Sequence, residues 1–107
     1  MLIMQEAAKI FRALADPTRR EILRILKPGA LAAGEIAAQF EMSAPSISRH
    51  LAILSGAGLV AAERDGNRLL YSLESQPLAE TLGDFLSAVC PTQRRRRRSS
   101  TKKGKSR

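Results

Sequence analysis

One segment combines two short apolar stretches with a turn signal, and it constrains the fold more than any other part of the sequence. In LVAAERDGNRLLYSL, residues 59–73, the apolar stretches 59–63 and 68–73 flank Asp65-Gly66-Asn67. Apolar stretches on either side of an Asp-Gly pair are typical of a β-hairpin. We therefore expect a hairpin here, with Arg64, Asn67 and Arg68 at its tip.

Helical periodicity occupies the sequence on both sides of this hairpin. Apolar residues recur at helical spacing around 3–14, 17–27, 33–40 and 77–90, and also between the expected caps Ser43 and Gly58. The sequence thus predicts a mainly α domain with a small β-hairpin (α+β), in the order α-α-α-α-β-β-α. This order is that of a winged helix-turn-helix with an extra helix at each end.

The helix that precedes the hairpin has one apolar side and one side of short polar residues. If Ile47 is the centre of the buried side, Leu51 and Leu54 lie within about 40° of it and Arg49 about 200° away. A helix in the major groove of DNA needs an arginine and short polar groups on its exposed side. The candidate DNA contacts are Ser43, Ser46, Ser48, Arg49 and His50.

These residues also have an ordinary interpretation, as a solvated helix face, and a packing or capping role for His50 is as well supported as a phosphate contact. The hairpin tip, with Arg64, Asn67 and Arg68, is predicted to contact the minor groove or phosphates, or simply to keep the hairpin soluble. Arg19 and Arg20 begin the second helix, where their charge opposes the helix dipole. A phosphate or carboxylate partner would explain them, and so would exposure alone.

The positive charge of the chain is concentrated at its end. The formal net charge is +8 over 107 residues, a length that suits one small domain. Residues 91–107 hold nine basic residues and no acidic one, whereas residues 1–90 hold nine basic and ten acidic residues. We expect residues 1–90 to form the winged helix-turn-helix and dimerisation domain, and residues 91–107 a disordered basic tail. The tail residues expected to bind DNA nonspecifically are Arg94, Arg95, Arg96, Arg97 and Arg98, unless the tail is only a solubilising or cloning-derived extension.

Three motifs, in this order and at this spacing, resemble a family of bacterial regulators. ALADPTRREILRIL, AGEIAAQFEMSAPSISRHLAILSGAGLV and ERDGNRLLYSL are similar to segments of the ArsR/SmtB repressors, and in particular of the metal-independent autorepressors of the sporulation-delay type. The resemblance covers about residues 6–90. It implies a repressor that binds double-stranded DNA.

The resemblance also implies a homodimer formed by the first and last helices. The residues expected at this interface are Ile3, Ile10, Leu78, Leu82, Phe85 and Val89, although the same pattern is compatible with an ordinary core. Two recognition helices related by a two-fold axis would bind an inverted repeat, with half-sites about 10 bp apart or a multiple of that.

The sequence departs from the metal-sensing members of the family. Their cysteine pair is absent from GEIAAQF, and the last helix offers Glu80 and Asp84 but no histidine. Soft metals need thiolate or imidazole ligands, so we expect no metal and no cofactor. The single cysteine, Cys90, is either a small apolar residue at a helix end or an oxidant sensor. Ala32 replaces a frequent capping threonine, which weakens the third helix by about 1 kcal/mol.

Other classes of protein receive less support. The sequence contains no arrangement of nucleophile and base, metal cluster or phosphate loop, so we expect no enzymatic activity. It has neither a signal peptide nor a stretch of about 18 apolar residues, which predicts a cytoplasmic protein without membrane contact. The alternative function is a winged-helix module that binds protein or RNA and is anchored by its basic tail.

Overall fold

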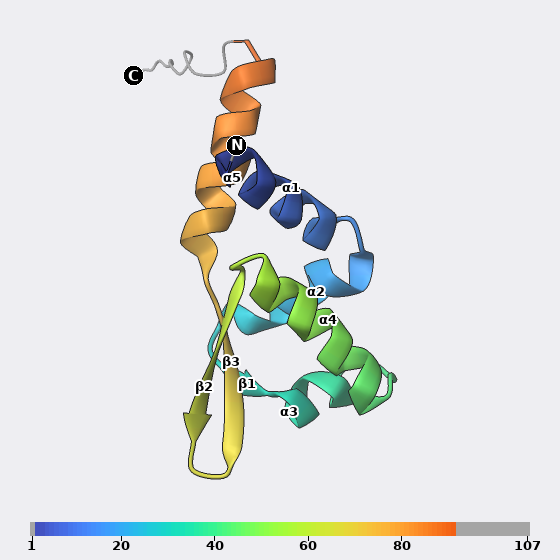
Figure 1. Cartoon of the computed structure of the whole chain (residues 1–107). Helices are drawn as coiled ribbons and strands as arrows, with labels where there is room; N and C mark the ends of the chain where they lie inside the picture. Colours follow the sequence, from blue (N-terminus) through green and yellow to red (C-terminus); the bar gives the residue numbers. More distant parts are fainter. Residues whose placement is uncertain (1, 92–107) are drawn as a thin grey trace, which may run out of the picture.

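The computed structural model describes residues 2–91 and places side chains from residue 5 to residue 91. The tail contacts predicted for Arg94, Arg95, Arg96, Arg97 and Arg98 lie outside the described residues, as does the side chain of Ile3. The elements are α1 (Leu2–Leu14), α2 (Pro17–Leu26), β1 (Leu31–Ala32), α3 (Ala33–Ala38), α4 (Ala44–Gly56), β2 (Val60–Asp65), β3 (Arg68–Leu73) and α5 (Ser75–Val89) (Figure 1).

The predicted order of helices and hairpin strands is confirmed, with one addition. The strand β1 pairs with β3 in antiparallel fashion, with Leu31 opposite Tyr71 and Ala32 opposite Leu70. The sheet therefore has three strands in the order β1-β3-β2, and the predicted hairpin is its larger part. A strand of two residues is too short to show a period in the sequence, and it was not predicted.

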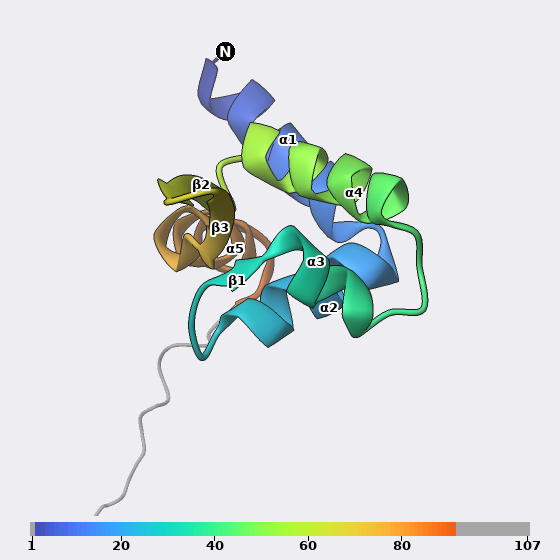
Figure 2. The same ribbon diagram turned by 90° about the horizontal axis from the view of Figure 1, so that it is seen from below.

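The core forms where α1, α2, α3 and α4 meet the start of β2. Figure 2 shows α4 lying along α1, with α2 and α3 on the other side of the core. The largest fully buried side chains are Ile22, Leu26, Ile36, Ile47, Leu51, Leu54 and Leu59. One side of α4 is therefore fixed in the core, and its opposite side faces solvent.

Local signals set most helix ends. The carboxylate of Asp16 accepts a hydrogen bond from the backbone amide of Arg19, and the hydroxyl of Ser43 accepts one from the amide of Ser46, so both caps formed as predicted. Gly58 has a φ of +79°, the left-handed conformation expected after α4. At α3, Ala32 provides no side-chain cap, as predicted, but its own backbone amide donates to Glu35 Oε1 over 2.8 Å.

Helix α5 leaves the sheet where β3 ends and runs past the start of α1 (Figure 1). The hairpin extends in the opposite direction, to the same end of the molecule as α3 and the first turns of α4. The domain thus has two ends of different composition. One end presents the hairpin tip and α4, and the other presents α1 and α5.

Candidate nucleic-acid interface

The exposed side of α4 carries the arginine and one of the serines predicted from the sequence. Ser48 and Arg49 are exposed, whereas Ile47 and Leu51 are buried. Ser43 and Ser46 lie at the start of the helix, where the Ser43 hydroxyl donates to Ser46 Oγ over 3.1 Å. Ser43 thus has a structural task as the cap. Ser48 and Arg49 are the residues free to reach a groove.

His50 lies at the edge of this surface and faces inward. Its side chain is 19% exposed, and its Nδ1 lies 3.9 Å from the carboxylate of Asp16. The same Nδ1 lies 3.4 Å from Nη1 of Arg19. The structure therefore places His50 at the junction of α4 with the start of α2, which agrees with the packing role rather than the phosphate contact.

Arg19 and Arg20 have partners that the sequence did not suggest. Arg19 donates from Nε to the carbonyl of Ala13 over 2.8 Å and from Nη2 to the carbonyl of Arg12 over 3.1 Å. Arg20 donates from Nη1 to the carbonyl of Leu14 over 2.7 Å. The last carbonyls of an α-helix have no partner within the helix, and cations are favourable at that end. The two arginines thus bind carbonyl groups at the end of α1, whereas the partners considered from the sequence were a phosphate, a carboxylate or solvent.

Asp16 connects these groups electrostatically. Partial burial acts to raise the pKa of its carboxyl group. The hydrogen bond from the amide of Arg19 and the charges of His50 and Arg19 outweigh this effect, so the pKa lies below its ordinary value. Asp16, Arg19 and His50 therefore form one cluster that joins α1, α2 and α4, and we call it the junction cluster.

The hairpin tip is fully exposed. Arg64, Asn67 and Arg68 all face solvent, and the backbone of Asp65 lies opposite that of Arg68 in the strand register. Gly66 has a φ of +66°, the conformation that a tight hairpin turn requires. Figure 1 shows this tip at the same end of the molecule as the start of α4, so the two predicted DNA contacts share one end.

The residues expected at a dimer interface separate into three groups. Ile10 is only 3% exposed and packs in the core of a single protomer, which agrees with the ordinary-core alternative and leaves little of its side chain for a partner. Leu78 and Leu82 are half-buried against α1 and α2. Phe85 and Val89 are 49% and 58% exposed.

Two further apolar residues extend the exposed group. Leu86 is 50% exposed, and Phe11 of α1 is 38% exposed and meets Phe85 edge to face, with ring centroids 5.4 Å apart. Phe11, Phe85, Leu86 and Val89 define the α1/α5 apolar surface. Phe11 and Ile10 are adjacent in a helix, and only the position of the core decides which of them is buried.

The described residues offer neither a membrane span nor a cluster of metal ligands. Within residues 2–91, no helix is long and apolar enough to cross a membrane. In the same part of the chain, no three His, Cys, Asp or Glu side chains gather as a metal site would require. Glu80, one of the acidic residues considered for metal binding, accepts a hydrogen bond from Gln76 Nε2 over 3.0 Å.

A helical core, a helix with an exposed Ser48 and Arg49, and a hairpin wing at the same end define a winged helix-turn-helix DNA-binding protein. Comparison with known proteins agrees, since residues 14–62 match the family model described as a helix-turn-helix domain.

The chain is 42% identical over 80 residues to the transcriptional repressor SdpR of Bacillus subtilis, which covers 75% of this chain and 89% of that protein. It is 40% identical over 82 residues to the HTH-type transcriptional regulator CmtR of Mycobacterium tuberculosis, covering 77% of this chain and 70% of that one. Among solved structures, an ArsR-like transcriptional regulator from Rhodococcus superposes with a TM-score of 0.74 at 30% identity, covering 83% of each chain.

The chain therefore belongs to the ArsR family of winged helix-turn-helix transcriptional regulators, as the three sequence motifs indicated. It is a DNA-binding regulator of transcription and not an enzyme.

Proposed function

We propose that the protein is a repressor that binds an inverted-repeat operator as a homodimer, without a metal ion. The observation that carries this proposal is the exposure of Ser48 and Arg49 on the side of α4 opposite the core, together with the position of the start of α4 at the same end of the molecule as the hairpin tip (Figure 1). Arg49 would supply the base contact, since an arginine pairs well with O6 and N7 of guanine. Ser48, Arg64, Asn67 and Arg68 would contact phosphates or neighbouring bases.

The homodimer is supported by the α1/α5 apolar surface. This surface includes two aromatic rings in edge-to-face contact, and its burial against a second copy of the chain would be favourable because apolar area leaves water. A related solved structure, from Mycobacterium bovis, is described as a homodimeric winged helix-turn-helix DNA-binding domain and superposes with a TM-score of 0.69 at 28% identity. A two-fold dimer would place two recognition helices on half-sites about 10 bp apart, or a multiple of that.

Repression is supported by the name of the relative SdpR, a transcriptional repressor. Independence from metal is supported by ligand chemistry. The chain has one cysteine and one histidine, and the histidine, His50, has its Nδ1 beside the guanidinium of Arg19. A cation at this distance opposes the binding of a metal ion to that nitrogen. Because operator DNA lies in the bacterial cytoplasm, the protein is proposed to act there.

The test of this function is a selection of bound DNA from a random pool, followed by affinity measurements on the selected sequence. We expect a palindromic consensus. Arg49→Ala should lower affinity for that sequence by about 1–3 kcal/mol and leave nonspecific binding nearly unchanged. Lys9→Ala removes the same charge from an exposed position on α1 and serves as the control.

Three results would contradict the proposal. Failure to enrich any sequence would favour a module that binds protein or RNA. An equal loss of affinity for all DNA sequences in Arg49→Ala would limit Arg49 to phosphate contact. Release of the operator by zinc, cadmium or arsenite, reversed by a chelator, would show that metal independence is wrong.

A further inference from the structure

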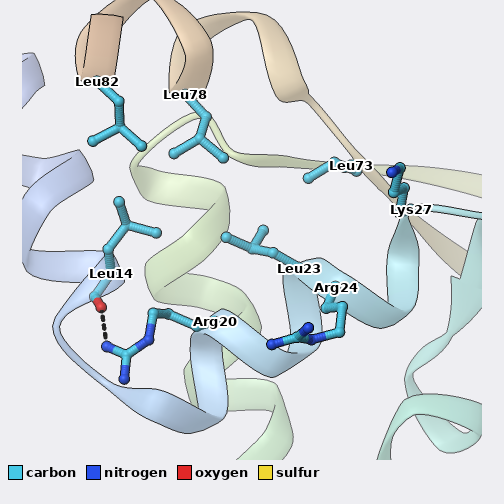
Figure 3. A pocket seen from close by; sticks show the side chains of 8 residues that line it. All are labelled: Leu14, Arg20, Leu23, Arg24, Lys27, Leu73, Leu78 and Leu82. Carbon is cyan, nitrogen blue, oxygen red and sulfur yellow. Dashed lines mark hydrogen bonds between the residues drawn. The ribbon is translucent and has the colours of Figure 1, made fainter. Parts of the chain in front are cut away.

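An apolar cavity, widely open to solvent, lies on the side of the domain where α5 passes α2. Its volume is about 370 Å³, within the range of small-molecule sites in proteins. Figure 3 shows Leu78 and Leu82 of α5 pointing toward Leu14 and Leu23 from the opposite side, with Leu73 of β3 at one end. The walls are thus five leucine side chains from four elements that are far apart in the sequence.

The edge of this cavity is positively charged. Arg20 and Arg24 of α2 line it, together with Lys27, which directly follows that helix (Figure 3). Arg24 pairs with Glu21 over 2.9 Å. Arg20 binds only the neutral carbonyl of Leu14, and Lys27 has no ion pair among the residues that the structure describes. Helix α2 and its C-cap residue therefore present three cations and one carboxylate at this edge.

This cavity is separate from the α1/α5 apolar surface. Leu78 and Leu82 turn toward α1 and α2 and are half-buried, whereas Phe85, Leu86 and Val89 further along α5 are exposed. A second copy that covered only the leucine walls would leave the exposed cations of Arg20 and Lys27 at the edge without a counter-charge. The combination of leucine walls and a cationic edge fits a molecule with a hydrocarbon body and one negative head group.

We propose that this cavity binds an amphiphilic carboxylate of the fatty-acid type, with its chain among the leucines and its head group beside Arg20 and Lys27. The chain leaves water for an apolar environment, and the carboxylate finds cations at the cavity edge. Two walls belong to the DNA-binding part of the domain, α2 and β3, and the others to α1 and α5. A molecule in the cavity would therefore alter the position of α5 relative to α2, and through it the affinity for DNA, a consequence that rests on the proposed function.

Binding is tested with the full chain and decanoate by isothermal titration calorimetry, without DNA. We expect saturable binding of one decanoate per protomer. Decyltrimethylammonium, with the same chain and the opposite charge, should bind about tenfold more weakly or not at all. Lys27→Glu should weaken decanoate binding about fivefold at low salt. Lys9→Glu makes the same charge change on α1, outside the cavity, and should stay within about twofold of the unmodified protein.

The position is tested by filling the cavity. Leu82→Trp should abolish binding, while Ser87→Trp, at an exposed position of the same helix, should retain it. Circular dichroism establishes that both variants fold. Should Leu82→Trp fail to fold, Leu78→Phe gives a second filling variant, and Lys27→Glu tests the charged edge without touching the walls.

Two results would overturn the proposal. Equal binding of both amphiphiles, unaffected by Leu82→Trp, would mean adsorption to the α1/α5 apolar surface. Methyl contacts between a labelled protomer's Leu78 or Leu82 and an unlabelled partner would mean that a second copy fills the cavity. Operator affinity is measured separately: bound decanoate without any change in affinity would refute the consequence for DNA, and a failed DNA selection would refute the proposed function while leaving the calorimetry valid.

Discussion

Replacement of Arg19 by methionine tests the junction cluster most directly. Methionine keeps much of the apolar stem of arginine but removes both hydrogen bonds, to the carbonyls of Ala13 and Arg12. Each such bond contributes about 1 kcal/mol net, and the favourable interaction of the cation with the end of α1 adds about 0.3–1 kcal/mol. We therefore expect Arg19→Met to lower the free energy of unfolding by about 2–3 kcal/mol.

Two neighbouring arginines serve as controls. Arg20→Met removes one exposed hydrogen bond and should cost about 1 kcal/mol. Arg24→Met removes an exposed ion pair with Glu21 and should cost less than about 0.5 kcal/mol. The assay is urea and thermal unfolding followed by circular dichroism, at one protomer concentration because dimerisation would make stability depend on concentration. In a domain of this size, 1 kcal/mol corresponds to a change in Tm of about 4–8 °C.

The reasoning is refuted if Arg19→Met is no less stable than Arg20→Met. It is also refuted if Arg19→Met keeps full stability but loses affinity for all DNA sequences alike. That result would support the phosphate contact that the sequence suggested for Arg19. It would also require the guanidinium group to leave the end of α1 when DNA binds.

Three further predictions concern acid stability, assembly and the tail. Because the pKa of Asp16 is lowered in the folded protein, the contribution of its carboxylate to stability is complete above the ordinary value of 3.8 and is lost as the pH falls through the lowered value. Asp16→Asn should therefore reduce the loss of stability below about pH 4, measured as the urea midpoint of unfolding. If the variant loses stability as steeply as the unmodified protein, Asp16 does not cause the acid sensitivity. Phe85→Asp should weaken the proposed dimer at least about tenfold in sedimentation experiments, whereas Ser87→Asp should not; a monomeric unmodified protein at micromolar concentration would remove the basis of the dimer. Deletion of the residues after Pro91 should leave the preferred DNA sequence unchanged. It should reduce the slope of log affinity against log salt concentration by about 0.9 for each phosphate that the tail neutralises in the full chain. Equal slopes for the full and truncated chains would mean that the tail does not bind DNA.

The elements that could be predicted from the sequence are those whose signals are local. Asp16-Pro17 and Ser43 mark helix starts because a side-chain oxygen caps amides only three residues away. Gly58 marks a helix end because the left-handed conformation favours glycine. The exposed position of Arg49 follows from helix geometry once Ile47 is assigned to the core.

The features that were missed depend on contacts between distant residues. Leu31 has a strand partner in Tyr71, and nothing near Leu31 in the sequence indicates it. The partners of Arg19 and Arg20 are carbonyls of the preceding helix, which become accessible only through the angle between α1 and α2. Arginines shortly after a helix end are a weak signal for such contacts. Because a helix start favours anions, the sequence instead indicated phosphate or carboxylate partners for these arginines.

A single residue, Glu74, separates β3 from α5, and its backbone amide donates to the carbonyl of Leu59 over 2.8 Å. The strand that leads to the wing tip and the helix that carries Phe85 are thus joined without a flexible segment. In the proposed dimer, the angle at this joint fixes how far apart two copies of α4 stand along the double helix. The half-site spacing that the protein prefers would then depend on the length of this one-residue connection, which lies far from any base pair. Insertion of one residue at Glu74 would therefore change the preferred half-site spacing while leaving the DNA-contacting residues of each protomer unchanged.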